Sequence, residues 1–465
     1  KSQNTRFFFF FFIFFFFIFL SILFVIFTSK YFIPILLLIK NIVNFTCFTR
    51  EYRLFYHWIR CDFSKKMKGL NVMEKLVPKL FTCLKHYSKE QFFKDVIAGI
   101  IVAIIALPLS IALALASGVT PEKGIFTAII AGFVISFLGG SKVQISGPTA
   151  AFATIVAGIV AQNGMDGLIL ATVMAGIILI LMGFFRLGNL IKFIPYTITT
   201  GFTAGIAVTI FIGQLKDFLG LSIHSSAPII ETTHKLSAAI DALPSLNWHA
   251  LLIGVICMAI LIFWPMISKR IPASLVAVIV GILLVQFLPI KVNTIGDLYT
   301  ISNKLPVFHL PEISMSGISK MFPSALTIAI LASIESLLSC VVSDSMINGK
   351  HRSNMELIAQ GAGNIASGLF GGIPATGAIA RTAANVKNGG RTPIAGIVHS
   401  ITLLLILVVL MPYAALIPMP TIAAILFMVA YNMSGWRQFW NLLKTSPKSD
   451  IMVLVVTFSI TVIFD

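Results

Sequence analysis

The chain has 465 residues, of which 57% are hydrophobic and 11% are charged. Soluble globular domains carry about 25% charged residues, so this composition excludes a soluble globular protein and predicts a polytopic, all-α membrane protein. The net charge is +17, and residues 1–95 contribute +10 of it. Because the remaining excess lies in short loops between apolar segments, it predicts orientation in the bilayer, and no nucleic acid is expected as a partner.

The first 66 residues contain a long, phenylalanine-rich apolar run. Such a run is typical of a membrane span or an uncleaved signal anchor. We favour another interpretation, because Phe, Ile, Lys and Asn are the residues that A/T-rich DNA encodes. Residues 1–66 are therefore expected to be translated upstream sequence, with the true start at Met67 or Met73. Residues 67–95 follow as a basic, amphipathic lead-in on the cytoplasmic membrane surface.

Apolar runs bounded by loop residues predict thirteen membrane segments within residues 96–465, which we treat as one transport domain. Seven fall in a first repeat (96–290) and six in a truncated second repeat (322–465). Short loops that contain Lys or Arg alternate with short loops that have neither, as expected for cytoplasmic and external loops. The predicted segments are 96–116, 122–139, 148–161, 167–185, 194–213, 249–267, 272–289, 322–343, 356–370, 377–387, 391–411, 417–431 and 449–464.

Segments 148–161 and 377–387 are too short to cross a bilayer as full helices. They lie in the stretches "QISGPTAAF" and "GGIPATGAIARTAANV", where Gly and Pro come just before a short helix. Irregular backbone is tolerated in a membrane only where protein covers it or where it lines a cavity. Both stretches therefore predict half-helices whose N-termini meet at mid-membrane. Free N–H groups and the helix dipole make such N-termini a site for one small anion.

The expected binding residues of this site fall into two kinds. Hydroxyl donors are expected from Ser146, Thr149 and Thr376. Close approach of the anion to the backbone is expected at Pro148, Ala150, Gly377, Ala378 and Ala380. The alternative for either stretch alone is a helix break or close helix packing without a ligand. Recurrence of the motif in both halves favours the site.

Glu335 lies near the middle of an apolar run, where a charged side chain costs at least about 2.5 kcal/mol. It therefore predicts a functional carboxyl that carries a proton or ligates Na⁺. Ser339 is four residues further and shares the same helix face. The alternative is a structural carboxylate that bonds neighbouring helices.

A similar spacing links the two halves. Pro374 follows Glu335 by 39 residues, and Pro148 follows Pro108 by 40. Corresponding helices would place residues 107–114 around the same cavity as Glu335. Two residues of that stretch, Ser110 and Leu113, are accordingly expected to line the substrate site.

Two further charges have alternative interpretations. Arg381 follows the second break by about two helical turns, and it is expected either to attract the anion or to anchor the cytoplasmic end of the segment. Asp344 should emerge at the cytoplasmic end of its helix, where we expect an ion pair with Lys350 or Arg352.

No cofactor, metal or enzymatic activity is expected. The five cysteines show no CxxC or Cys/His spacing, so neither a disulfide framework nor a zinc site is indicated. The sequence has no HExxH, GxSxG or Walker A motif.

Four stretches resemble the SulP (sulfate permease) family of anion transporters in its bacterial form. They are "QISGPTAAF", "ALPLSIALALASGVTPEKGIFTAIIAGF", the run from "IESLLSCVV" to "TPIAGIVH", and "SDIMVLVVTFSITVIFD". The resemblance extends from about residue 90 to 465. It implies an inverted repeat of seven plus seven segments, a core domain that moves against a gate domain by an elevator-like motion, and a homodimer.

The resemblance also implies roles for particular residues. The acidic coupling residue of the family matches Glu335, and Ser339 matches a hydroxyl-bearing neighbour of that site. The family continues with a last span and a cytoplasmic STAS domain, so the chain is expected to be a fragment that transports poorly by itself.

The expected function is secondary active transport of a small anion across the plasma or inner membrane. Sulfate is the preferred substrate, with H⁺ weakly favoured over Na⁺ as the coupling ion. Bicarbonate or a C4-dicarboxylate is the alternative within the family, because helix dipoles stabilise any small anion. An anion channel and a nucleobase permease of related architecture are less favoured alternatives.

Overall fold

The computed structural model describes residues 76–463, except 86, 190–194, 224–230, 269–270, 289–290, 302–303 and 313. Residues 1–66, which we expect to be translated upstream sequence, lie outside the described residues. Within the described part the chain is almost entirely helical, and its only named strands are β1 (Ser146–Gly147) and β2 (Thr376–Gly377).

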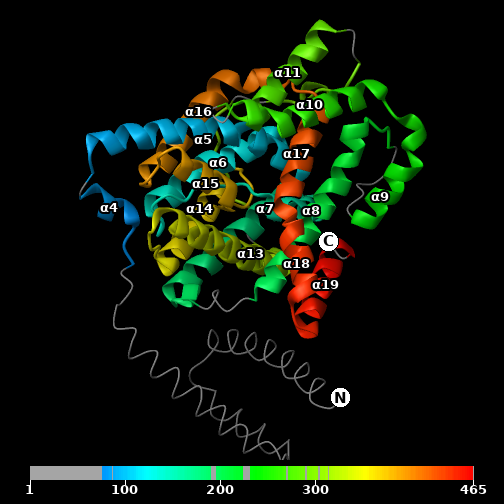
Figure 1. Ribbon diagram of the computed structural model, residues 1–465. Helices are drawn as coiled ribbons and strands as arrows, with labels where there is room; N and C mark the ends of the chain where they lie inside the picture. Colours follow the sequence, from blue (N-terminus) through cyan, green and yellow to red (C-terminus); the bar gives the residue numbers. More distant parts are fainter. Residues whose placement is uncertain are drawn as a thin grey trace, which may run out of the picture. The chain divides into compact units, whose positions relative to one another are not determined.

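The helices follow the predicted order (Figure 1). The first half contains α4 (Lys79–Leu84), α5 (Lys89–Ala116), α6 (Pro121–Leu138), the 3₁₀ turn η1 (Ala150–Phe152), α7 (Ala153–Phe184), α8 (Tyr196–Leu219), α9 (Thr232–Asp241), the 3₁₀ turn η3 (Leu243–Ser245), α10 (Trp248–Ile267), α11 (Ala273–Phe287) and α12 (Ile295–Leu298). The second half contains α13 (Met315–Ile347), α14 (Ser353–Leu369), α15 (Ile379–Lys387), α16 (Ile394–Ala414), α17 (Met419–Ser434), α18 (Trp436–Thr445) and α19 (Lys448–Ile463).

Each predicted membrane segment has a helical counterpart. Eight helices or helix pairs of the described residues are long and apolar enough to cross a bilayer. Predicted segments 148–161 and 167–185 correspond to two helical stretches of α7, which meet at Gly164, where the backbone leaves the helical conformation (φ 66°, ψ −170°). The short first segment is therefore separate from the second, as predicted, and the break between them is this glycine.

The first span begins earlier than predicted. α5 begins at Lys89 and not at residue 96, so the end of the predicted lead-in is part of this helix. Ser88 caps it by accepting a hydrogen bond from Gln91 N (3.2 Å). The charges at the end of the lead-in predict a boundary at residue 96, but this cap and the buried carboxylate of Asp95 hold the charged turn in the helix.

Three helices were not predicted. α9 lies in the long loop 214–248, α12 lies between residues 290 and 321, and α18 lies between the last two predicted spans. All three are short, and a search for long apolar runs does not detect such helices.

The helices pack in two groups. We define the core group as α5, α6, α7 and α13–α16, and the gate group as α8, α10, α11, α17 and α19, because each set packs mainly within itself. Figure 1 shows α17 and α8 of the gate group side by side, and the contacts agree.

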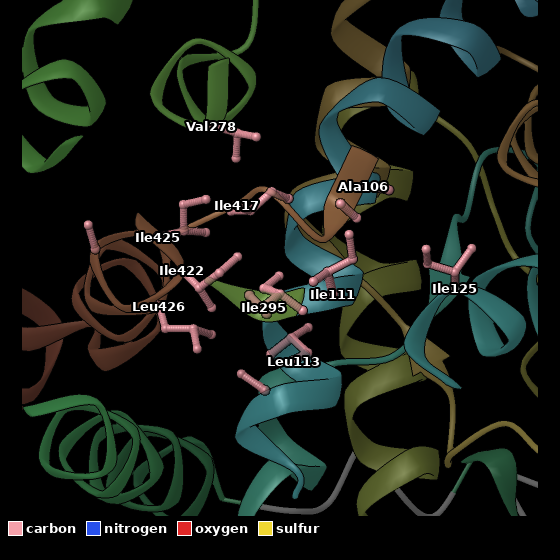
Figure 2. Packing of buried hydrophobic residues seen from close by; sticks show 14 of the residues in the cluster. Ala106, Ile111, Leu113, Ile125, Val278, Ile295, Ile417, Ile422, Ile425 and Leu426 are labelled. Atoms are coloured by element: carbon pink, nitrogen blue, oxygen red, sulfur yellow. The ribbon is translucent and has the colours of Figure 1, made fainter. Parts of the chain in front are cut away.

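One apolar cluster joins the two groups. Figure 2 shows Ile295 of α12 between Ile111 of α5 and Ile422 of α17, and all three are at most 1% exposed. Backbone hydrogen bonds from Ile295 N to Ile417 O and from Met419 N to Asn293 O, both 2.9 Å, fix the α12 segment against the start of α17. Apolar side chains therefore provide the contact between the core and gate groups.

Glycines allow the core helices to approach closely. A Cβ at Gly176 of α7 would lie 2.6 Å from Gly361 O of α14, and a Cβ at Gly361 would lie 2.5 Å from Gly176 O. Backbones in membrane helices approach this closely only where both helices carry small residues.

We predict that Gly361→Ala destabilises the protein, because the added methyl group meets the α7 backbone. Overpacking of this kind costs about 1–3 kcal/mol. The measurement is thermal unfolding of the purified protein in detergent, and the expected result is a lower Tm. Gly158→Ala is the matched control, since nothing lies within 4 Å of a Cβ at Gly158. Equal melting temperatures for the two variants would contradict the close contact.

Candidate functional site

The two predicted breaks meet in a two-stranded antiparallel pair. Ser146 of β1 lies opposite Gly377 of β2, and Gly147 lies opposite Thr376. All four residues are buried. Because the strands are antiparallel, the chain leaves the pair in opposite directions, and a helix begins just after each strand: η1, which continues into α7, and α15.

Both helix starts keep their first backbone N–H groups free. The N-cap residues Thr149 and Ala378 make no capping hydrogen bond with their side chains. Among the described residues, no acceptor binds the backbone N–H of Ala150 or Ala151 at the first start, or of Ile379 or Ala380 at the second. Two uncapped helix starts on one strand pair give a region rich in N–H donors with the positive ends of two helix dipoles.

Asn364 of α14 holds the backbone of the second break. Its Oδ1 accepts a hydrogen bond from Ala375 N (2.9 Å), and its Nδ2 donates to Ala375 O (2.8 Å). Thr127 of α6 accepts a hydrogen bond from Ile373 N (2.7 Å). These side chains satisfy backbone groups that would otherwise be unpaired in the membrane interior.

Glu356 of α14 holds the segment before the first break. This carboxylate is 0% exposed. It accepts four hydrogen bonds: from Gly140 N (2.8 Å), Ser141 N (3.0 Å), Gln144 Nε2 (3.0 Å) and Gln360 Nε2 (2.9 Å). Gln360 Nε2 also donates to Ser146 Oγ (3.2 Å). Glu356 is thus a structural carboxylate, and its helix links both breaks.

Glu335 lies beside the first helix start. Thr149 Oγ1 donates a hydrogen bond to Glu335 Oε2 (2.9 Å), which joins α13 to the first break. Glu335 is half-buried. The structure thus brings together two residues that the sequence analysis placed in one site, although they are far apart in the chain.

Arg381 lies inside the protein. Its side chain is 2% exposed, and its Nη2 donates to Pro148 O (3.1 Å). A Cβ at Gly147 would lie 2.6 Å from Nη1, so the guanidinium rests on the first break and only glycine leaves room for it. Its Nε and Nη1 are buried and have no hydrogen-bond partner among the described residues. The alternative of a cytoplasmic anchor is therefore wrong.

Other predicted residues have different contacts from those expected. The hydroxyl of Thr376 bonds Ser336 Oγ (2.6 Å) and lies 3.2 Å from Ala332 O, so it faces α13. Ser339 Oγ donates to Thr382 Oγ1 (3.4 Å), and among the described residues no hydrogen bond joins Ser339 to Glu335. These hydroxyls link the second break to α13 through short side chains.

The residues predicted from the first span are buried in α5. Ser110 is 0% exposed, and its hydroxyl has no hydrogen-bond partner among the described residues. Leu113 belongs to the same apolar cluster as Ala150 and Ala151. α5 therefore packs against the first helix start, as the spacing of the two halves predicts.

The expected ion pair of Asp344 with Lys350 or Arg352 is wrong. Asp344 Oδ2 instead accepts hydrogen bonds from His351 N and bonds His351 Nδ1, both at 2.7 Å. Arg352 reaches away to Val77 O and to Thr82 Oγ1 (3.2 Å). The loop after α13 folds His351 back toward the helix end, and sequence distance alone does not show this.

His399 of α16 is a further buried polar residue that the sequence analysis did not single out. It is 0% exposed, and neither ring nitrogen has a hydrogen-bond partner among the described residues. A Cβ at Gly132 would lie 3.9 Å from His399 Nδ1 and 3.2 Å from Ser146 O, so His399 lies near β1. A lone ionisable residue in the apolar run "GIVHSITLLL" is the sequence signal that marks it.

The chain has relatives among anion transporters. Residues 92–457 match the profile of the sulfate permease family. The Bacillus subtilis protein "Putative sulfate transporter YvdB" is 45% identical over 383 residues, covering 82% of this chain and 72% of that protein. The "Bicarbonate transporter BicA" of Picosynechococcus is 32% identical over 382 residues, covering 80% and 67%.

Solved structures share the fold. The transmembrane domain of a cyanobacterial bicarbonate transporter BicA matches with a TM-score of 0.73 at 28% identity, covering 81% of this chain and 96% of that one. SLC26A9 matches with a TM-score of 0.75 at 20% identity, covering 87% and 67%, and this likeness concerns the fold alone. The predicted all-α, inverted seven-plus-seven architecture is confirmed.

We predict that Asn364→Ala destabilises the protein, because it leaves both polar groups of Ala375 unpaired in the interior. An unpaired buried group costs about 1–3 kcal/mol. The expected result is a lower Tm of the purified protein, with Asn364→Asp intermediate because it keeps the acceptor for Ala375 N. Asn388→Ala is the control, since the Asn388 side chain donates to the carbonyl of Ala384 at the end of α15 and makes no other hydrogen bond among the described residues. A Tm for Asn364→Ala equal to that of the control would contradict the role of this clamp.

Proposed function

The chain belongs to the sulfate permease family and is a multi-pass membrane protein, and on that premise we propose that it carries sulfate by secondary active transport. The preference for sulfate rests on the name of the Bacillus subtilis relative, which has the higher identity of the two relatives described. Bicarbonate is the second candidate, because the BicA proteins share both sequence and fold with this chain.

One observation carries the proposal. The β1–β2 pair sets two uncapped helix starts and the guanidinium of Arg381 around the same backbone. A dianion such as sulfate suits this arrangement, because N–H donors and a positive charge surround a site with small side chains. Ala150, Ala378 and Ala380 place only small side chains beside these N–H groups, and Ala380 is exposed.

The interface between the two helix groups supports an elevator-like motion. Among the described residues, no side-chain hydrogen bond joins α5, α6, η1 or α7 to α8, α10, α11 or α17. The contact is made instead by apolar residues such as Leu113, Ile422 and Leu426. Apolar contacts have no fixed direction, so the core group can slide along the gate group without breaking polar contacts. The β1–β2 pair would move with the core group and carry the anion.

Glu335 is our candidate for the coupling residue. It lies on the core group and is hydrogen-bonded to Thr149 at the helix start, so its protonation or Na⁺ binding would act directly on the anion site. We propose H⁺ coupling and a homodimeric assembly as parts of the same mechanism. A carboxyl that gains a positive ion offsets part of the charge of an entering dianion.

We predict that Glu335→Gln abolishes coupling without loss of the fold, because Gln keeps an acceptor for Thr149 but takes up no proton. The experiment is uptake of radiolabelled sulfate into proteoliposomes under an imposed pH gradient or Na⁺ gradient. Gradient-driven uptake should fall about tenfold or more, the scale of a lost interaction with a charged group. Glu312→Gln is the matched control, since Glu312 is exposed.

Three outcomes of the Glu335 experiment decide between the alternatives. Unchanged uptake and pH dependence in Glu335→Gln would show that Glu335 is only structural. Uptake of bicarbonate but not sulfate by the parent protein would select the second candidate substrate. Large, uncoupled anion currents across the same membranes would contradict a carrier.

We predict that Arg381→Gln weakens sulfate binding about tenfold to hundredfold, because a charged donor is lost from the site. Arg381→Lys should weaken it less, since the charge remains and only the planar fork is lost. The measurement is the concentration of sulfate that gives half-maximal uptake. Arg437→Gln, at an exposed arginine, is the control. Equal sulfate affinity in Arg381→Gln and in the control would remove Arg381 from the site.

A further inference from the structure

A polar pocket of about 380 Å³ lies between α4, the start of α5 and two loops of the core group. None of the residues of the proposed transport site lines it. The loops are the one after α6 and the one between α15 and α16. The lining residues that matter for its chemistry are Lys79, Tyr87, Gln91, Lys142, Arg391 and Thr392.

The charge of the pocket is positive. Lys79, Lys142 and Arg391 line it, and among the described residues no carboxylate lies within ion-pair distance of any of the three. Lys142 comes from the loop after α6 and Arg391 from the loop before α16, so the three cations come from three separate segments. Tertiary folding gathers them at one pocket without a neutralising partner.

The carboxylate beneath the pocket is fully engaged. Asp95 is 0% exposed. It accepts five hydrogen bonds: from Tyr87 Oη (2.9 Å), Gln91 Nε2 (3.0 Å), Arg391 N (2.8 Å), Thr392 N (3.3 Å) and Thr392 Oγ1 (2.6 Å). Burial, followed by the hydrogen bond to Asp95, raises the pKa of Tyr87 well above its usual value. Asp95 thus holds four groups that line the pocket, and among the described residues it makes no ion pair with a lysine.

The surroundings of Lys79 disfavour its charged form. Burial, followed by the charges of Arg352 and Lys142, lowers the pKa of Lys79 below its usual value. Holding these cations together therefore costs free energy in the absence of an anion. A bound anion would relieve that cost.

The surroundings of the pocket are those of a membrane surface. Phe81 of α4 is 48% exposed and packs edge-on against Phe137 of α6, with ring centroids 5.9 Å apart. Phe137 stacks on Phe133, and both rings are exposed. Phe92 and Phe93 at the start of α5 are also exposed. Exposed phenyl rings next to a cationic pocket are typical of segments that lie in the bilayer interface.

We propose that this pocket binds the phosphate group of an anionic phospholipid at the membrane surface. The cations supply charge-assisted donors for the phosphate oxygens, and the neighbouring rings would contact the acyl chains. A free phosphate ion has the same chemistry for the cations but makes no use of the rings. Because α4, α5 and the two loops all contact the pocket, a bound headgroup clamps the lead-in to the core group.

The test is the thermal stability of the purified full chain in detergent, titrated with short-chain phosphatidylglycerol, short-chain phosphatidylcholine or inorganic phosphate. A ligand that binds only the folded state raises Tm with concentration. Phosphatidylglycerol should raise Tm, and the other two should raise it much less. Lys79→Gln/Lys142→Gln should weaken the response about tenfold or more, because two charged donors are lost.

Lys85→Gln/Lys89→Gln is the matched control, since it removes two exposed lysines near the pocket that do not line it. Lys142→Arg, which keeps the charge, should retain the response and so distinguishes lost binding from a damaged fold. A response to inorganic phosphate equal to that for phosphatidylglycerol would replace the lipid by a free anion. An equal response to phosphatidylcholine, or a pocket variant that responds like the parent, would overturn the proposal. All of these outcomes are independent of whether the parent protein transports sulfate.

Discussion

The structure depends on the hydrogen bonding of irregular backbone inside the membrane. Four residues leave the helical conformation to form the β1–β2 pair, and a bilayer offers no water to satisfy their backbone groups. The pair satisfies part of this need by itself. α14 supplies much of the rest, with Asn364 on Ala375 and Glu356 on Gly140 and Ser141. Helix α14 is therefore as essential to the site as the residues that would touch an anion.

The buried charges follow from this arrangement. Arg381 and Glu335 both reach the first break, Arg381 through Pro148 O and Glu335 through Thr149. A buried charge without sufficient partners is costly, and Nε and Nη1 of Arg381, which have no partner in the described part of the chain, represent such a cost. A transported anion that binds there would offset it.

The contacts within the core group differ in chemistry from the contacts between the core group and the gate group. Polar contacts hold the breaks rigidly within the core group. The contact between the core and gate groups is instead an apolar cluster around Ile295 (Figure 2). Rigid polar contacts on one side and non-directional apolar contacts on the other are what a sliding carrier requires. The cationic pocket at Lys79 and Lys142 lies on the core group as well, so a ligand there would act on the part that is proposed to move.

The sequence by itself determined the membrane class, the order of the spans and the two breaks, because apolar length and Gly–Pro interruptions are local properties of the chain. It also identified Thr149, Glu335 and Arg381 as candidates, since polar residues in apolar runs are rare. Only the tertiary structure decided that Thr149 bonds Glu335, that Arg381 is interior, and that Asp344 pairs with His351. It likewise gathered Lys79, Lys142 and Arg391 at one pocket. These outcomes depend on residues far apart in the chain, and helix packing, not local pattern, sets which of them meet.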